Sequence, residues 1–288
     1  HTADDQAETV LMNLARAAGL DGLTGMRDHW SEHGVHWSRP FLHMGREDLR
    51  GYLRRQGLAW IDDPSNENDR FSRVKARKAL RALSPLGITV ERLSETASHL
   101  ASARQALNHA VSNLADTLVT ERAGGLTVPR QTFRHLMPDM QRRLLLGMIG
   151  WMGGAGYPPR SAALFRLEWA LDQGKPATLG GVRFRPRADH ILVTREARAV
   201  QGAVPKGQRW DHRWQLVGPT LEGAEIAALG THGLQDCPDW RDHAPREVLL
   251  TSPALWHDGR LIAAPLAGKT GEYRVELAAS LTEFILSH

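Results

Sequence analysis

Four side chains that can bind a cation or carry a proton stand within the first eight residues of the chain: His1, Asp4, Asp5 and Glu8. In an α-helix, residues three or four positions apart lie on one face. Asp5 and Glu8 are three apart, and His1 and Asp5 are four apart. Apolar residues at matching helical positions follow them, namely Val10, Leu11 and Leu14. We therefore expect a polar site on a buried helical stem, with a cation as its ligand.

Helix capping is an alternative explanation for part of this pattern. Thr2-x-x-Asp5 ahead of an apolar run forms a capping box, and carboxylates suit the positive end of a helix dipole. Capping accounts for Thr2 and for Asp4 or Asp5, but it leaves His1 and Glu8 without a role. A metal site is less well supported because no second histidine stands at ligand spacing, so no metal ligands are predicted here.

The order of motifs along residues 1–77 resembles the second half of the catalytic domain of the tRNA(Ile)-lysidine synthetase family, which belongs to the N-type ATP pyrophosphatases. The first motif is His-x-x-Asp-Asp-x-x-Glu-Thr over residues 1–9. The others are Arg39-Pro40-Phe41-Leu42, the Arg-Glu-Asp-Leu-Arg-Gly-Tyr-Leu run at 46–53, and Asp63-Pro64-Ser65-Asn66 followed by Arg73 and Arg77. Four motifs in this order are far more specific than any one of them alone.

The resemblance implies a reaction and its participants. ATP with Mg²⁺ would adenylate the C2 oxygen of the wobble cytidine in a tRNA(Ile) with a CAU anticodon, and free L-lysine would then displace AMP. Asp5 and Glu8 would hold the lysine ammonium and favour loss of its proton, while His1 and Asp4 would orient them or approach the nucleotide. The residues expected to contact tRNA or nucleotide are Arg39, Asp63, Asn66, Arg73 and Arg77.

The sequence also departs from the family pattern. The family's glycine-rich Ser-Gly-Gly-x-Asp-Ser loop, which holds the ATP phosphates, does not occur in this chain. We therefore assign no ATP-binding residues, and we expect a fragment that does not turn over ATP by itself. Ala17 stands where the family has glycine, which predicts a strained backbone if that position is left-handed. Val74 stands where the family usually has asparagine, so the side-chain hydrogen bond of that asparagine is not expected in this chain.

Composition narrows the class of protein. The 288 residues carry a net charge of +4, which suits a polyanionic partner, and no apolar run is long enough to span a membrane. We expect a cytoplasmic protein and make no prediction of its oligomeric state. A single cysteine, Cys237, excludes an internal disulfide and argues against a sulfide-transferring relative. Another N-type pyrophosphatase acting on tRNA, or a non-catalytic tRNA-binding remnant, remains the alternative.

Periodicity and turn residues predict the elements that position these groups. Helices are expected over 45–57, 89–120, 137–151 and 161–171, and strands over 35–39, 60–61, 178–186, 191–195, 247–250 and 260–264. The fold class predicted is an α/β fragment of a Rossmann-like ATP-pyrophosphatase domain, followed by a helical domain and a small mixed α+β module. The boundaries expected are 1–84, 85–176 and 177–288.

Two further expectations concern the C-terminal region. Arg183 and Arg185 alternate with apolar residues, so both guanidinium groups should share one face of a hairpin, and we expect this face to touch tRNA. Four tryptophans are expected in the core rather than as base-stacking platforms: Trp210, Trp214, Trp240 and Trp256.

Overall fold

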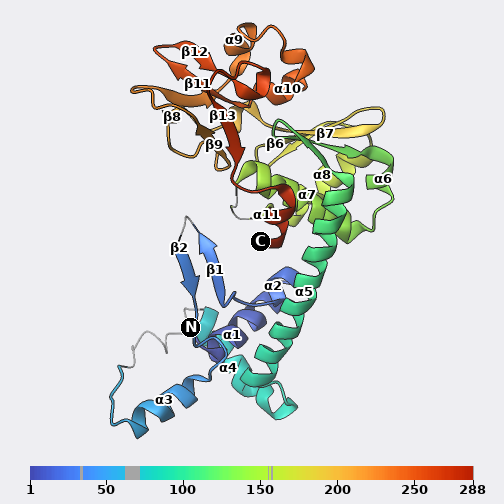
Figure 1. Ribbon diagram of the computed structural model, residues 1–288. Coiled ribbons are helices and arrows are strands. Elements are labelled where there is room, and N and C mark those ends of the chain that lie inside the picture. Colours follow the sequence, from blue (N-terminus) through green and yellow to red (C-terminus); the bar gives the residue numbers. More distant parts are fainter. Residues whose placement is uncertain (33–34, 62–71, 155, 157, 288) are drawn as a thin grey trace. The chain divides into compact units, whose positions relative to one another are not determined.

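The structure is a computed structural model that describes residues 1–32, 35–61, 72–154, 156 and 158–287 (Figure 1). The chain divides into two compact units, His1–Leu107 and Asn108–His288. The long helix α5 (Val90–Leu118) begins in the first unit and ends in the second. The three-part division expected from the sequence stays a prediction.

Unit 1 is built mainly from helices. These are α1 (Ala3–Leu14), α2 (Leu20–Leu23), α3 (Arg46–Arg55), α4 (Ser72–Leu83), the 3-10 turn η2 (Ser84–Leu86) and the first part of α5. The strands described in this unit, β1 (His29–Glu32) and β2 (Val35–Ser38), form a two-stranded antiparallel sheet. Ala3, Ala7 and Val10 form the buried face of α1, and Val74 and Leu80 are buried on α4. Leu14, expected on the buried stem, is 56% exposed.

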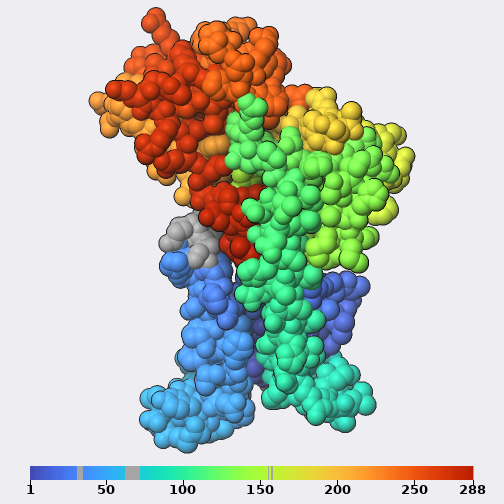
Figure 2. Space-filling model, turned by 45° about the vertical axis from the view of Figure 1, so that its right-hand side comes forward, coloured from blue at the N-terminus to red at the C-terminus, as the bar shows by residue number. Residues whose placement is uncertain are grey.

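The helix expected over 45–57 is present as α3, which ends where Gly57 adopts a left-handed φ of 67°. The N–H of Gly57 donates to the carbonyl of Arg54, and that of Leu58 to the carbonyl of Leu53, a C-terminal cap that glycine favours. None of the residues of α3 is buried, and its light-blue atoms lie at the surface in Figure 2. The strand expected at 60–61 is wrong, because both residues lie outside any regular element.

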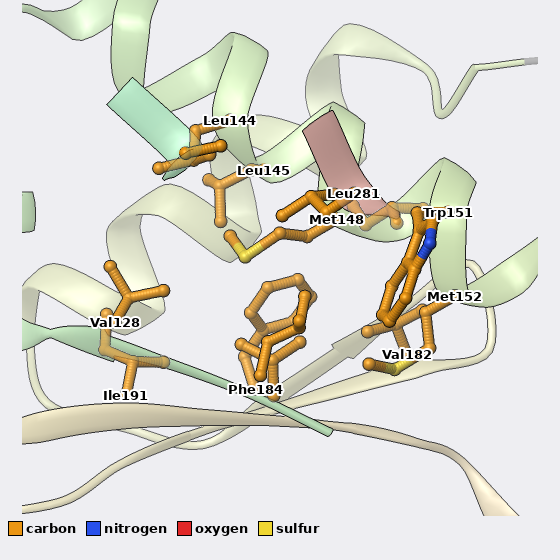
Figure 3. Close-up of a cluster of buried hydrophobic side chains, with 14 of the residues drawn as sticks. Val128, Leu144, Leu145, Met148, Trp151, Met152, Val182, Phe184, Ile191 and Leu281 are labelled. Atoms are coloured by element: carbon orange, nitrogen blue, oxygen red, sulfur yellow. The ribbon is translucent and has the colours of Figure 1, made fainter. Parts of the chain in front are cut away.

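The first part of unit 2 is a five-stranded antiparallel sheet covered by helices. Its strand order is β3 (Thr120–Arg122), β4 (Gly125–Pro129), β7 (His190–Arg195), β6 (Val182–Pro186) and β5 (Ala177–Leu179). The helices are α6 (Arg130–Arg134), α7 (Pro138–Gly153), α8 (Ser161–Asp172) and α11 (Leu281–Ser287). Met148 of α7 and Phe184 of β6 meet in the core (Figure 3). The helices expected over 137–151 and 161–171 are confirmed.

Two expectations for this sheet need correction. The strand expected over 178–186 is two strands, because Gly180 and Gly181 have φ values of 61° and 70° and turn the chain between β5 and β6. Such paired positive φ values define the tight turn of a two-residue hairpin. The region 85–176, expected to be helical, also contains the strands β3 and β4. Both are too short to show a clear alternation of apolar and polar residues in the sequence.

The last part of unit 2 is a mixed module. One sheet has the order β12 (Arg260–Ala263), β11 (Pro253–His257), β10 (Glu225–Ala228) and β8 (Val204–Pro205), and another pairs β13 (Arg274–Leu277) with β9 (Trp214–Val217). The helices are α9 (Gly230–Gln235) and α10 (Arg246–Leu249), and the 3-10 turns are η3 (Ala197–Ala199), η4 (Trp240–Asp242) and η5 (Pro265–Ala267).

Trp210 and Trp214 are buried in this module, which confirms their assignment to the core, and Trp240 and Trp256 pack against a neighbouring cluster. The strand expected at 247–250 is wrong, since the short helix α10 begins there at Arg246, directly after Pro245 at its N-cap. The chain as a whole is a mixed α/β protein, as expected. A Rossmann-like arrangement of unit 1 stays a prediction. Among the described residues, no helix is both long enough and apolar enough to span a membrane.

Candidate functional site

The N-terminus of α1 is capped by its own acidic residue. The backbone N–H of Thr2 donates to Oδ2 of Asp5 at 2.8 Å, and the Thr2 hydroxyl donates to the same oxygen at 3.1 Å. This is the capping box anticipated from the sequence. It uses one carboxylate oxygen of Asp5 and leaves the other, Oδ1, for contacts outside the helix.

Asp5 and Glu8 both face arginines that come from other helices. Oδ1 of Asp5 lies 3.1 Å from Nη2 of Arg46 and 3.6 Å from Nη1 of Arg73. Oε1 of Glu8 lies 2.6 Å from Nε of Arg77 and 3.8 Å from Nη2 of Arg46. Two carboxylates on α1 therefore meet three guanidinium groups from α3 and α4, and the result is an ion-pair network and not an open acidic pocket.

Glu8 is the most deeply placed member of this network, with only 1% of the residue exposed. Its second oxygen, Oε2, is buried and has no hydrogen-bond partner among the residues that the structure describes. A buried carboxylate oxygen without a donor costs free energy, because burial removes the water that would otherwise solvate it. Within the part of the chain that the structure describes, this oxygen is therefore an acceptor of the network that is ready for a donor from a ligand.

Asp4 connects α1 to the start of α3. Its Oδ2 accepts a hydrogen bond of 2.7 Å from the backbone N–H of Arg46, the first residue of α3. The backbone N–H of Ala3 donates to the carbonyl of Met44 nearby. A carboxylate at a helix N-terminus accepts from an otherwise unpaired N–H and interacts favourably with the helix dipole. Asp4 therefore holds the start of α3 in the position from which the Arg46 side chain contacts Asp5.

His1 and Arg39 also lie together. Nε of Arg39 donates to Nδ1 of His1 at 3.3 Å, and Nη1 of Arg39 donates to the carbonyl of Arg27 at 2.7 Å. The guanidinium carbon of Arg39 lies 4.3 Å from the ring centre of Trp30. The structure thus places two groups of the predicted residues in unit 1: His1 with Arg39, and Asp4, Asp5 and Glu8 with the arginines Arg73 and Arg77. Asp63 and Asn66 lie outside the described residues.

Two polar residues that sequence reasoning did not single out hold the segment after α1. The side chain of Gln6, only 4% exposed, accepts from the N–H of Met26 at 2.7 Å and donates to its carbonyl at 3.1 Å. Asn13 donates to the carbonyl of Gly22 at 2.7 Å. The single signal for Gln6 is a polar residue at an apolar position of the helix. Arg46 belongs to the motif at 46–53, but its partners Asp4 and Asp5 are far away in sequence, so the sequence does not predict their contact.

Ala17 occupies the left-handed region, with φ of 54°, which is the condition under which we expect a strained backbone at this position. It follows α1 in a C-terminal cap in which Ala17 N–H donates to Leu14 O and Ala18 N–H donates to Asn13 O. Left-handed backbone costs about 1 kcal/mol more for alanine than for glycine. We expect Ala17→Gly to raise the free energy of unfolding of unit 1 by about 0.5 kcal/mol, once the greater freedom of unfolded glycine is subtracted. Thermal unfolding would measure this, and Ala18→Gly, with no positive φ to relieve, should destabilise instead.

The described residues contain no group of three or more His, Cys, Asp or Glu side chains arranged to hold a metal ion. The described part of the site can act through charged groups. Its guanidinium groups can neutralise phosphate, and one buried carboxylate oxygen can accept a hydrogen bond from an ammonium group.

A family model described as a PP-loop domain matches residues 1–83, which contain the whole of the network described above. These residues place the chain in the class of PP-loop proteins. The tRNA(Ile)-lysidine synthase of Ruegeria pomeroyi is 43% identical over 293 residues, covering 100% of this chain and 70% of that protein. The chain belongs to the tRNA(Ile)-lysidine synthase family.

More distant relatives carry the same name. The tRNA(Ile)-lysidine synthase of Anaplasma marginale is 28% identical over 295 residues, which cover 92% of this chain and 63% of that protein. That of Wolbachia pipientis wMel is 29% identical over 284 residues, which cover 94% and 66%. The chain therefore spans 63 to 70% of the length of these three relatives.

Proposed function

We propose that the natural protein containing this chain makes lysidine in tRNA(Ile) with a CAU anticodon. The C2 oxygen of the wobble cytidine would attack the α-phosphorus of ATP and release pyrophosphate. The ε-amine of free lysine would then attack C2, lose a proton, and displace AMP. The observation that carries this proposal is the 43% identity with a tRNA(Ile)-lysidine synthase over the entire chain.

ATP use fits the PP-loop match at residues 1–83. Mg²⁺ is proposed as the companion of ATP, but the described residues offer no cluster of metal ligands, so no step is assigned to Mg²⁺ here. The arginines of the network would act on the nucleotide and tRNA phosphates. Arg73 is well placed for that because its side chain is 44% exposed and lies 3.6 Å from Oδ1 of Asp5, a longer separation than the other contacts of that oxygen in the described network.

Lysine recognition is proposed for Asp5 and Glu8. An ammonium group entering the network would compete with Arg46 for the two carboxylates, because Arg46 is the guanidinium that bridges them, at 3.1 Å from Asp5 and 3.8 Å from Glu8. The buried oxygen Oε2 of Glu8, which has no donor in the described part of the chain, would accept one ammonium hydrogen. The same carboxylates would receive the proton that the amine loses on attack.

Pyrophosphate release tests the function itself. The full-length natural protein should release pyrophosphate in the presence of ATP and tRNA(Ile) with a CAU anticodon, and form a lysine adduct only when lysine is added. A tRNA with the anticodon changed to GAU is the control and should give neither product. Adduct formation with another amine but not with lysine would reject the substrate. Binding of tRNA without pyrophosphate release would favour a non-catalytic tRNA-binding protein.

Asp5→Asn should raise the KM for lysine by about tenfold or more while leaving the KM for ATP within about twofold, because a charge-assisted hydrogen bond contributes roughly 1.5–3 kcal/mol. Asparagine keeps an oxygen that can cap Thr2, so α1 should survive the change. Asp116→Asn, at an exposed carboxylate of α5, is the matched control. Equal effects on the lysine and ATP requirements would remove Asp5 from lysine binding. The measurement is steady-state kinetics with each substrate varied in turn.

A further inference from the structure

The hairpin β1–β2 carries a pair of stacked tryptophans, of which Trp30 is half-buried and Trp37 is exposed. Trp30 on β1 is directly opposite Trp37 on β2, and the two rings stack with centres 5.9 Å apart and planes 11° apart. Trp37 is 50% exposed, as is Val35 two residues before it on the same face of β2. In the described part of the chain these strands pair only with each other, and all four residues of β2 are exposed.

Arg39 extends this pair into a ladder. It is two residues beyond Trp37, and its guanidinium carbon lies 4.3 Å from the ring centre of Trp30. Two hydrogen bonds hold the guanidinium plane there, from Nε to Nδ1 of His1 and from Nη1 to the carbonyl of Arg27. A planar cation and two indole rings are thus lined up on one small surface.

Stabilisation of the hairpin accounts for only part of this arrangement. An isolated two-stranded hairpin is marginal in water, and a cross-strand aromatic pair strengthens it. That role requires the contact between Trp30 and Trp37. It does not require half of Trp37 to remain in water, or a guanidinium group fixed by two hydrogen bonds over the adjoining ring. Both features are typical of surfaces on which an unpaired nucleobase stacks.

We propose that Trp30, Trp37 and Arg39 form a stacking platform for one unpaired base of an RNA loop. The platform rests on the proposed function, which supplies a tRNA as partner. The positive charge of Arg39 suits a polyanion and disfavours an apolar peptide. Arg39 also donates a hydrogen bond to His1, which precedes α1. A base stacked here would therefore lie beside the start of α1, the helix that carries Asp5 and Glu8.

Binding of an RNA stem-loop with the CAU anticodon loop to the 288-residue chain tests the platform. Trp37→Ala should weaken binding about tenfold, the effect of losing one base–aromatic stack. The dependence of affinity on salt concentration should keep its slope, because no phosphate contact is removed. Trp37→Phe keeps an aromatic pair with Trp30, and should recover most of the affinity. Trp169→Ala is the matched control, since Trp169 of α8 is 54% exposed and lies in unit 2.

A change in the RNA separates stacking from misfolding of the hairpin. Single abasic substitutions through the loop should identify one position at which the wild-type chain binds the abasic RNA more weakly than the intact RNA. At that position Trp37→Ala should bind both RNAs with the same affinity. Equal loss at every position in both proteins would overturn the platform, as would equal weakening by Trp169→Ala. Unchanged RNA binding by Trp37→Ala, combined with Trp37-dependent self-association in sedimentation, would assign the hairpin to a second copy of the chain instead.

These outcomes are distinct from failure of the proposed function. Lysine-dependent pyrophosphate release by the full-length protein, together with unchanged binding by Trp37→Ala, would overturn the platform and leave lysidine formation standing. Absence of both pyrophosphate release and RNA binding would overturn the two together.

Discussion

Arg77→Met is expected to lower the free energy of unfolding of unit 1 by about 3 kcal/mol. Arg77 holds Oε1 of Glu8 at 2.6 Å, and the Glu8 side chain is 1% exposed. Removing one partner of a buried ion pair costs about 3–5 kcal/mol, because the other charge is left without compensation. We expect the lower end, since Arg77 is 21% exposed and Arg46 still lies 3.8 Å from Glu8.

Hydrogen exchange is the suitable measurement because it reports α1 and α4 separately from unit 2. Protection of the amides in 3–14 and 72–83 should fall in Arg77→Met. Arg81→Met, one turn further along α4 at an exposed position, should change protection by no more than about 0.5 kcal/mol. The double variant Glu8→Gln/Arg77→Met should recover part of the loss, since the buried charge is then gone. Equal effects of the two arginine variants would show that the ion pair does not hold these helices together.

The same residues show how far sequence reasoning reaches. Helical spacing correctly placed Asp5 and Glu8 on one helix and identified the cap at Thr2, because both depend only on residues a few positions apart. It did not reveal that Arg46, Arg73 and Arg77 neutralise these carboxylates. Arg46 and Arg77 are 41 and 69 residues from their partners, and local periodicity contains no information about such pairs. The sequence therefore predicts a polar site that binds a cationic ligand, where the structure has a network of ion pairs with arginines of the chain itself.

The secondary structure shows the same difference between features that local sequence determines and features that it does not. Helices α3, α5, α7 and α8 were predicted to within a few residues, because their apolar positions recur over several successive turns. Short helices and strands were harder to predict from the sequence. Residues 246–249 form a helix, although Val248 and Leu249 beside further apolar residues suggested a strand, and a run of that length does not distinguish the two. The sequence predicts one strand over 178–186, whereas Gly180 and Gly181 form a turn within that range.

Asp211→Asn is expected to destabilise unit 2 by about 3–5 kcal/mol. Asp211 is fully buried, and its two oxygens lie 3.0 and 3.1 Å from Nε and Nη2 of Arg195. It has a positive φ of 45°, which asparagine tolerates better than most residues, so the substitution changes the charge with little effect on the backbone. The variant would keep Arg195 in a buried site without its anionic partner.

A second buried arginine increases this expected loss. Arg213 is 5% exposed, lies against Trp151 and Trp214, and donates to the carbonyl of Gly124. Burial lowers the pKa of Arg213 to about 10, while the charge of Asp211 opposes that shift and the charge of Arg195 adds to it. Since a pKa of about 10 leaves Arg213 protonated at pH 7, the variant would place two like charges near each other with their shared anion removed.

An exposed ion pair with nearly the same separation provides the control. Nη2 of Arg134 lies 3.0 Å from Oδ1 of Asp172, but these side chains are 42% and 57% exposed. Asp172→Asn should therefore change the free energy of unfolding by less than about 1 kcal/mol, as exposed pairs do. Urea-induced unfolding followed by tryptophan fluorescence would measure both variants. A similar small effect of Asp211→Asn would mean that burial does not strengthen the Arg195–Asp211 pair, and that packing around Trp210 and Trp214 alone holds the C-terminal module in place.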